Sequence, residues 1–347
     1  MITSYFMKTI LHITFLSFLF TSSASADFKA GVDAYIANDY VTAYKELKPF
    51  AEQGNADAQQ KLGYMYVTGQ GVTQDYKEAV KWYRLAALQG NADAQHNLGI
   101  SYDIGEGVTQ DYKEAAKWFR LAALQGDIES QFNLATMYAS GQGVTQDYKE
   151  AVKWYYLAAG QGNDRAQYNL GNMYLDGRGV TQDYTEAAKW FRLAASQEFD
   201  RAQYNLGMMH INGEGVTQDY KEAAKWFRLA ASQESNRAQY SLGVIYLNGQ
   251  GVTKDYKEAA KWFRLAAHQG NVHAHYNLGW LYWQGKGVIK NYVLSHMWFN
   301  IAAINGDQEA EKARAALEIQ IKSKEKIARA KELARECIEN HYKNCRL

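Results

Sequence analysis

Proline is almost absent from this sequence, which has one proline in 347 residues. Average proteins contain several per cent proline, and proline interrupts helices, so its scarcity predicts a mainly helical chain. An excess of charge of one sign is also lacking, because 38 Lys and Arg residues stand against 37 Asp and Glu residues. A nearly neutral protein has no field that concentrates polyanions, so we do not expect nucleic acid as the main partner.

Long hydrophobic segments are scarce too. The apolar run at residues 9–20 follows Lys8 and precedes an Ala-Ser-Ala sequence that ends at Ala26. It is shorter than the about 20 residues that span a bilayer, and its order of features is that of a secretory signal peptide. We therefore predict a signal peptide over residues 1–26, cleaved after Ala26, and an exported chain from residue 27 to 347. The start codon stays open between Met1 and Met7. No cysteine follows the run, so no lipid anchor is indicated.

A period of 36 residues dominates the sequence after residue 56. The Leu-Gly pair, the Gly-x-Gly-Val motif, the Asp-Tyr pair and an Ala-Ala pair all recur at this interval, with Ala135 replacing the glycine of one Leu-Gly pair. Seven tryptophans share the same spacing: Trp82, Trp118, Trp154, Trp190, Trp226, Trp262 and Trp298. Such regularity predicts an all-α solenoid in which each repeat covers the apolar face of the next.

Each repeat predicts two helices, shown here for residues 56–91. The first, which we call the A helix, covers about 56–67 and ends at Gly69 and Gly71. The second, the B helix, begins after Asp75, which can cap it while Glu78 completes a capping box. Its apolar face contains the repeated tryptophan, which we expect to fill the core between repeats. A glycine ends most B helices, but Glu198 and Glu234 take that place in two of them.

The pattern A-x-x-x-L-G-x-x-Y-x-x-G-x-G-V-x-x-D-Y-x-x-A-x-x-W-x-x-x-A-A-x-x-G resembles the Sel1-like repeat, a relative of the tetratricopeptide repeat. The resemblance covers residues 56–307, or seven repeats. It implies an α/α superhelix with the A helices on the concave side. It also implies a scaffold or adaptor for proteins, since catalysis is the exception in this family.

The two ends of the array are expected to act as caps. Residues 27–55 form a degenerate N-terminal helix pair in which Glu46 takes the tryptophan position, as suits a face in water. Residues 308–347 form a C-terminal cap, in which we predict one charged helix over 308–339 followed by a tail.

One stripe of the A helices varies between repeats and is the candidate binding surface. Residues 57, 60, 64 and 68 and their equivalents share this stripe, opposite the Leu62 face. Its first position is acidic in three repeats (Asp57, Asp93, Glu129) and arginine in the next three (Arg165, Arg201, Arg237). Because tyrosine and arginine are enriched at binding hot spots, we predict a groove for a protein or peptide partner lined by Arg165, Tyr168, Arg201, Tyr204, Arg237, Tyr240, Tyr276 and Trp280.

Two other interpretations of the repeated residues stay open. Recent duplication alone would also repeat the tyrosines, which would then lie half-buried between helices. On the B helices, Lys77, Lys81, Arg84 and their equivalents form a basic stripe. Since the net charge is near zero, we favour a solvated outer face paired with acids over a surface for anions.

The sequence offers little for catalysis, a cofactor or a metal. His268, His273 and His275 lack the spacing of a metal site, because residues two apart on a helix point to different sides. No nucleophile motif or phosphate loop is present, and the cysteine pair in each repeat that marks β-lactam-hydrolysing relatives is missing. We predict a non-catalytic, monomeric scaffold without a cofactor or metal, in the periplasm or secreted. The alternatives are a cell-wall-active or β-lactam-binding enzyme and a secreted binder of a host protein.

Cysteine occurs only twice, at Cys337 and Cys345. An exported protein meets an oxidising compartment, in which paired cysteines form disulfides. In a continuous helix their Cα atoms would be about 12 Å apart, beyond the roughly 7 Å that a disulfide tolerates. We therefore predict a helix that ends near Cys337 and a Cys337–Cys345 disulfide that fixes the tail.

Overall fold

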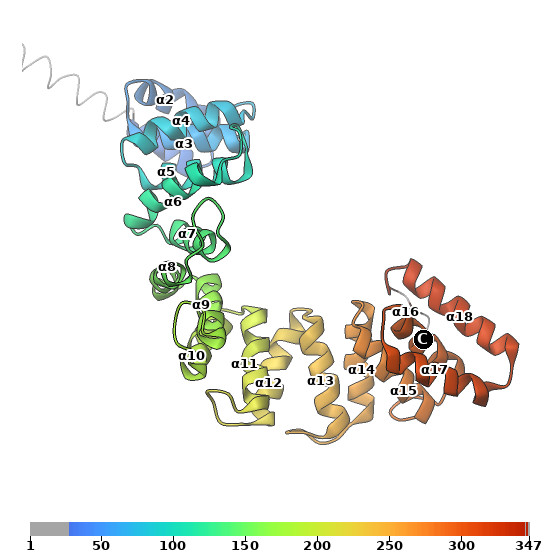
Figure 1. Cartoon of the computed structure of the whole chain (residues 1–347). Coiled ribbons are helices and arrows are strands. Elements are labelled where there is room, and N and C mark those ends of the chain that lie inside the picture. The colour runs from blue at the N-terminus through green and yellow to red at the C-terminus, as the bar shows by residue number, and fades with distance from the viewer. Residues whose placement is uncertain (1–27, 344, 346–347) are drawn as a thin grey trace, which may run out of the picture. The chain divides into compact units, whose positions relative to one another are not determined.

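The computed structural model describes residues 28–343 and 345, and within them the regular structure is helical (Figure 1). The predicted signal peptide and its cleavage site after Ala26 lie outside the described residues. Residues 28–36 are helical, and they are followed by α2 (Tyr40–Glu52), α3 (Ala56–Thr68), α4 (Tyr76–Leu88), α5 (Ala92–Ile104), α6 (Tyr112–Leu124), α7 (Ile128–Ser140), α8 (Tyr148–Gly160), α9 (Asp164–Asp176), α10 (Tyr184–Ser196), α11 (Asp200–Asn212), α12 (Tyr220–Ser232), α13 (Asn236–Asn248), α14 (Tyr256–His268), α15 (Val272–Gln284), α16 (Tyr292–Ile304), α17 (Gln308–Ile321) and α18 (Lys324–Glu339).

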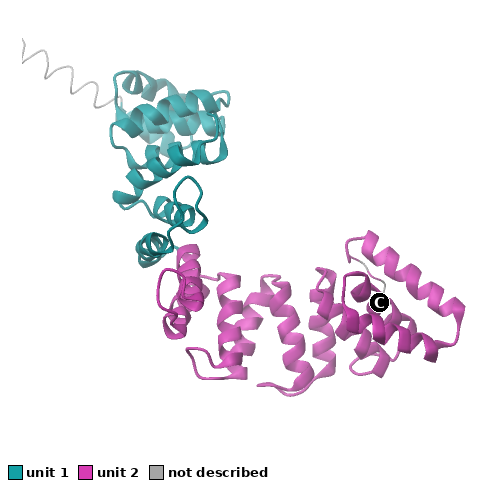
Figure 2. Cartoon of the chain, viewed as in Figure 1, with its two compact units in different colours: residues 1–163 teal, residues 164–347 magenta. Residues whose placement is uncertain are grey.

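Seven helix pairs, α3–α4 to α15–α16, correspond to the seven predicted repeats. The chain divides into two compact units, residues 1–163 and 164–347 (Figure 2). Unit 1 contains the N-terminal helices and three repeats, and unit 2 contains four repeats and the C-terminal helices. Consecutive helices within each unit pack against one another, so the predicted solenoid architecture is confirmed.

Local sequence signals set the helix ends. Asn55 accepts a hydrogen bond from the Ala58 amide and caps α3, which ends at Gly69 with a left-handed φ of 70°. Asp75 caps α4 by accepting from the amides of Lys77 and Glu78. The predicted capping box, however, is not closed: the Asp75 N–H donates to the Tyr66 carbonyl at 3.0 Å, while the Glu78 carboxylate pairs with Lys81 at 3.3 Å. The A helix therefore supplies the bond that the box would have made.

Close packing of the two helices in a repeat depends on the repeated Leu-Gly pair. A methyl group added to Gly243 of α13 would lie 2.4 Å from the Phe263 ring of α14. Gly63 faces Tyr83 in the same way, at 2.5 Å. The glycine thus leaves the space that the aromatic ring of the B helix occupies.

The expectation that the tryptophans fill the core is wrong for the middle repeats. Trp118, Trp154, Trp190, Trp226 and Trp262 are only partly buried, whereas Trp82 and Trp298 at the two ends are buried. The next residue along the B helix fills the interior instead, as Phe191, Phe227 and Phe263 show, each no more than 1% exposed. The tryptophan lies at the edge of the same apolar face, where Trp226 packs against the core around Phe191 and Leu206.

Buried glutamines join neighbouring repeats, a feature that the sequence analysis did not anticipate. Gln59 of α3 donates through Nε2 to the Ala51 carbonyl of the preceding helix at 2.9 Å. Its Oε1 accepts from Gln89, at the end of α4, at 2.8 Å. The same arrangement recurs at Gln239, which bonds Ala231 and Gln269. Each such side chain adds a second hydrogen bond to a carbonyl at a helix C-terminus, which also accepts from a backbone amide of the following turn.

The C-terminal cap differs from the predicted single helix over 308–339. The chain breaks at Lys322, whose φ is 51°, and Ser323 then caps α18 by accepting from the Lys326 amide. Both α17 and α18 pack against α16, whose residues 295–302 are all buried between them. A continuous helix could not cover both sides of α16, so the break follows from this burial.

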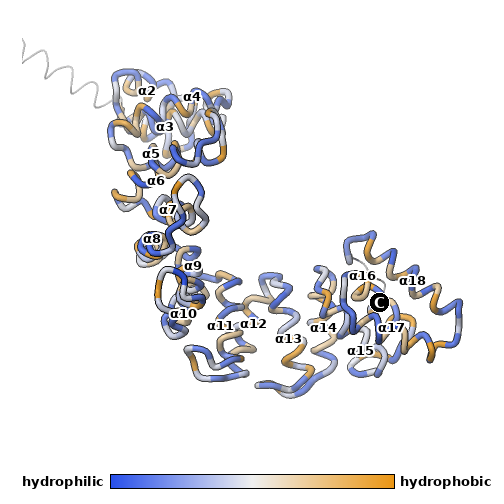
Figure 3. The backbone as a smooth tube through the Cα atoms, in the orientation of Figure 1, coloured by the Kyte–Doolittle hydropathy of each residue, from blue (hydrophilic) through white to orange (hydrophobic). Residues whose placement is uncertain are grey.

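The tail beyond α18 turns back toward the helices. Helix α18 ends at Glu339, two residues beyond Cys337. His341 and Tyr342 have positive φ values, and Cys337 is joined to Cys345 by a disulfide with a Cα–Cα distance of 4.7 Å. In the described part of the chain, no helix combines the length and hydrophobicity that crossing a bilayer requires, and polar residues interrupt every helix in Figure 3.

Candidate partner-binding surface

The candidate surface lies on the A helices of unit 2, namely α9, α11, α13 and α15. Arg201 and Arg237 stand in the first turn of α11 and α13 and are exposed. Both line a cavity of about 460 Å³, which we call the arginine cavity, together with Tyr168, Asp200, Tyr204, Asn205, Ser235, Asn236 and Gln269. Among the described residues, neither arginine forms an ion pair, so both guanidinium groups remain available to a ligand.

The predicted tyrosines have a structural role as well. Each is partly buried, with its ring centroid 5.6–5.8 Å from the phenylalanine of its own B helix. Burial raises the pKa of Tyr240 and Tyr276. Packing between helices therefore accounts for part of the tyrosine repetition, as the duplication interpretation expects. Tyr168 and Tyr204 also line the arginine cavity.

A second, smaller cavity lies further along α11 and α13. It has a volume of about 240 Å³ and is lined mainly by apolar side chains, so we call it the apolar cavity. Met208 and Ile211 come from α11, and Tyr240, Val244 and Ile245 come from α13. The equivalent of Met208 in α9 is the polar Asn172, so α9 lacks the apolar residue that α11 and α13 have at this position.

Three of the predicted groove residues lie apart from these cavities, and one of them, Tyr276, lines a different cavity of about 710 Å³. Arg165 is exposed in the first turn of α9 and does not line the arginine cavity. Trp280 is partly buried against the cores of α14 to α17, with Lys286 Nζ 4.6 Å from its ring centroid. The structure therefore brings Arg201, Arg237, Tyr168 and Tyr204 together and separates Trp280 from them.

Two of the three acidic residues at the stripe's first position in unit 1 have internal partners. Asp57 accepts a hydrogen bond from the Asn91 side chain at 3.0 Å, and Glu129 accepts from Asn163 at 2.8 Å. Both asparagines directly precede an A helix: Asn91 precedes α5 and Asn163 precedes α9. These bonds join the start of the A helix to the end of the same repeat. Asp57 and Glu129 therefore have a structural role, whereas Arg201 and Arg237 form no ion pair among the described residues.

The basic stripe on the B helices is largely paired, as expected for a solvated outer face. Lys117 and Lys153 each lie 2.5 Å from the glutamate one turn earlier. Arg84 and Arg228 donate to tyrosine hydroxyls of the next A helix, at 2.5 Å and 3.0 Å. Exposed pairs of this kind contribute little stability. The lysines at the first position of the stripe, such as Lys149 and Lys221, are exposed at the starts of the B helices.

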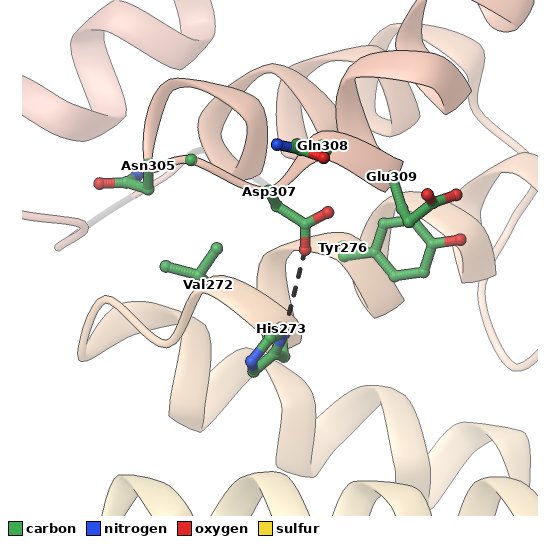
Figure 4. Close-up of a pocket in the computed structure, with 8 residues that line it drawn as sticks. Val272, His273, Tyr276, Asn305, Asp307, Gln308 and Glu309 are labelled. Carbon is green, nitrogen blue, oxygen red and sulfur yellow. Dashed lines mark ion pairs between the residues drawn. The ribbon is translucent and has the colours of Figure 1, made fainter.

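The three histidines around residue 270 do not converge. His275 is fully buried and its Nε2 bonds the Ala267 carbonyl at 2.9 Å, and burial lowers its pKa to about 4. His273 is exposed, and its Nδ1 lies 3.9 Å from Asp307 Oδ2 across a cavity of about 710 Å³ (Figure 4). In the part of the chain that the structure describes, no group of three histidine, cysteine or acidic side chains could hold a metal.

A histidine, serine and aspartate cluster in unit 1 was missed by the sequence analysis, because its members lie on different helices. His96 Nδ1 lies 2.8 Å from Ser130 Oγ and 3.2 Å from Asp127 Oδ1. Burial raises the pKa of Asp127, but bonds with His96 and Ser130 outweigh it and lower the pKa to about 2. A catalytic triad requires serine and aspartate on different imidazole nitrogens. Here both share Nδ1 and Ser130 is fully buried, so the cluster is structural.

Comparison with known families identifies the fold. The Sel1 repeat model matches residues 56–91, 92–127, 128–163, 164–199, 200–235, 236–271 and 272–307, and the chain belongs to the Sel1 repeat family. Such repeats form tetratricopeptide-like solenoids, a fold typically used for protein–protein interaction. Sel1 repeat solenoids are generally non-catalytic scaffolds.

Two crystal structures are similar over most of their length. One is c5321, a protective antigen present in uropathogenic Escherichia coli strains, with 30% identity, a TM-score of 0.55 and coverage of 93% of both chains. The other is a Sel1 repeat protein from Oxalobacter formigenes, with 33% identity and a TM-score of 0.61, covering 69% of this chain and 96% of that one. No curated protein matches the chain.

Proposed function

We propose that this protein is an exported scaffold that binds a protein or peptide partner on the A helices of unit 2. The observation that carries the proposal is the arginine cavity, where Arg201 and Arg237 stand beside Tyr168 and Tyr204. Arginine and tyrosine supply much of the binding energy at protein interfaces. Because the arginines form no ion pair among the described residues, burying them under a partner breaks no internal ion pair.

The enzymatic alternative has less support. A cell-wall-active or β-lactam-binding enzyme needs polar groups that converge on one reacting centre. His275 bonds the Ala267 carbonyl while His273 faces Asp307. In the His96 cluster, Ser130 and Asp127 contact the same imidazole nitrogen and Ser130 is fully buried. One relative is described as a protective antigen. For this reason, a secreted binder of a host protein is the second candidate function.

Charge reversal on the surface tests partner binding. The mature chain, residues 27–347, is used to capture proteins from envelope extracts, and the captured partner is then purified. We expect replacement of Arg165, Arg201 and Arg237 by glutamate to abolish binding and leave the circular dichroism unchanged. The control replaces Lys149, Lys221 and Lys257, exposed at the starts of B helices, by glutamate and should bind normally. If the arginine variant still binds the purified partner, the surface is wrongly assigned.

Export is tested on protein recovered from cell fractions. We expect the periplasm or the medium to contain a chain that begins at Asp27. Alkylation without reduction should leave its intact mass unchanged, because the Cys337–Cys345 disulfide leaves no thiol to react. A cytoplasmic chain that retains residues 1–26, or two alkylatable thiols per exported chain, would contradict the proposal.

A further inference from the structure

We propose that the partner contributes an extended segment with a carboxylate side chain and, about three residues away, a large apolar side chain. The carboxylate binds between Arg201 and Arg237, and the apolar side chain enters the cavity lined by Met208 and Val244. This inference rests on the proposed function, since it specifies the ligand of the same surface.

The order of side chains along α11 and α13 is the basis for this ligand. Each helix presents an arginine in its first turn, a tyrosine one turn later and an apolar residue in the third turn: Arg201, Tyr204 and Met208 on α11, and Arg237, Tyr240 and Val244 on α13. The arginine cavity and the apolar cavity lie at the two ends of this shared surface. A ligand that fills both cavities must be acidic at the end beside the arginines and apolar at the end beside Met208 and Val244.

The charge of the arginine cavity favours an anion. Two arginines and one acid, Asp200, line it, so its net charge is positive. Arginine bonds carboxylates through paired N–H donors, and such charge-assisted bonds are among the strongest in proteins. Asn205 and Asn236 also line the cavity and add amide donors. Asp200 repels a carboxylate ligand, so a variant that removes its charge should bind such a ligand more tightly.

The spacing within the ligand follows from helix geometry. Arg201 and Met208 are seven residues apart, or about 10 Å along a helix that rises 1.5 Å per residue. A peptide in the extended polyproline II conformation advances about 3.1 Å per residue and presents every third side chain on the same face. About three residues therefore separate a carboxylate in the first cavity from an apolar side chain in the second.

The experiment uses an array of immobilised ten-residue peptides and the mature chain. Each peptide carries one glutamate and one phenylalanine in a glycine-serine background, and the number of residues between them varies from none to six, in both orders. We expect the strongest binding with two or three intervening residues in one order. Changing the glutamate to glutamine should weaken binding at least tenfold, as should raising the salt concentration.

Matched variants assign each half of the ligand. The double variant R201Q/R237Q should lose the preference for glutamate over glutamine, and M208D/V244D should lose the preference for phenylalanine over serine. D200N should bind the glutamate peptides more tightly. The control variant R192Q/K221Q changes exposed residues of the B helices and should behave as the parent chain does.

Several outcomes would overturn the inference. These are no binding to any peptide, binding that ignores the glutamate or its spacing, and an unchanged preference in R201Q/R237Q. Self-association of the chain that R201Q/R237Q disrupts would identify the ligand as a second copy. A purified partner that depends on the arginines but lacks such a segment would refute this inference and leave the proposed function standing. A partner whose binding ignores the arginines would refute the proposed function itself.

Discussion

At the scale of single residues, the glycine of each Leu-Gly pair sets the distance between the helices of a repeat. The ring that faces it is almost wholly buried, as for Phe263 and Phe299. Repeat 128–163 is the exception among the seven repeats. There Ala135 replaces glycine and is fully buried, and the opposing Tyr155 hydroxyl lies 3.0 Å from Thr136 Oγ1.

Replacing Gly243 by alanine tests this packing. The added methyl group would lie 2.4 Å from the Phe263 ring, and overpacking of this kind costs about 1–3 kcal/mol. We expect the free energy of unfolding, measured by urea denaturation, to fall by that amount. The control is Gly160→Ala in the last position of α8, where nothing lies within 4 Å of the new methyl group. That change should be neutral or stabilising, since alanine is the better helix former. Equal losses in both variants would show that packing is not the cause.

The sequence predicted which residues share a helix face but not which of two neighbours is buried. Phe227 and Trp226 are adjacent, so they lie about 100° apart on a helix and both fit a broad apolar face. Only contact with Gly207 of the A helix places Phe227 inside. The role of the acidic residues at the stripe's first position was also ambiguous in the sequence. Asp57 bonds Asn91, which lies 34 residues away in the chain. The periodicity of one helix contains no information about such bonds to residues far along the chain.

At the scale of elements, the C-terminal cap required information that the sequence does not display. The segment 308–339 contains no glycine or proline, so nothing marks a break. The chain nevertheless breaks at Lys322, in a left-handed conformation that non-glycine residues rarely adopt. The burial of α16 between α17 and α18 compensates for this local cost. The single helix was thus a reasonable local prediction that tertiary packing overrode.

The last repeat also replaces the buried glutamine by His275, which makes the stability of the cap depend on pH. Its Nε2 bonds the Ala267 carbonyl as the glutamines do, and Tyr342 of the tail packs against its ring at 5.1 Å. Burial lowers the pKa of His275 to about 4, against about 6.5 in an unfolded chain. Between these values the unfolded chain binds the proton and the folded one does not. Stability therefore falls as the pH falls from about 6.5 to about 4.

We expect this pH effect to be about 2 kcal/mol between pH 7 and pH 5 for His275 alone, since pH 5 lies about 1.5 units below the unfolded pKa and each unit corresponds to about 1.4 kcal/mol. The variant His275→Gln restores the residue that other repeats use and should remove this part of the dependence. The measurement is urea denaturation of the two proteins at pH 7 and pH 5, followed by near-UV circular dichroism of the tryptophans. His296 also has a pKa lowered by burial, so some dependence should remain. An identical pH profile for both proteins would exclude His275 as a source.

At the scale of the whole molecule, stability is distributed along the array. Within each unit, neighbouring repeats contact each other through the glutamine bonds and through turn glycines such as Gly251, where a methyl group would lie 2.3 Å from the backbone of Tyr220 in the preceding repeat. Contacts of this kind couple adjacent repeats but not distant ones. Damage to one repeat should therefore spread by one or two repeats and then stop.

The variant Phe227→Ala tests how far such damage spreads. Phe227 is 1% exposed, and truncating a buried phenylalanine costs about 3–5 kcal/mol. We expect faster hydrogen exchange in α11, α12 and α13 while α3 to α6 keep their protection. Trp226→Ala is the matched control, and because Trp226 is only partly buried it should have a smaller effect over the same helices. Trp190→Ala should act in the same local way one repeat earlier. A uniform loss of protection from residue 30 to 340 would instead mean that the array unfolds as one cooperative body, and the repeats could not then be treated as separately stable neighbours.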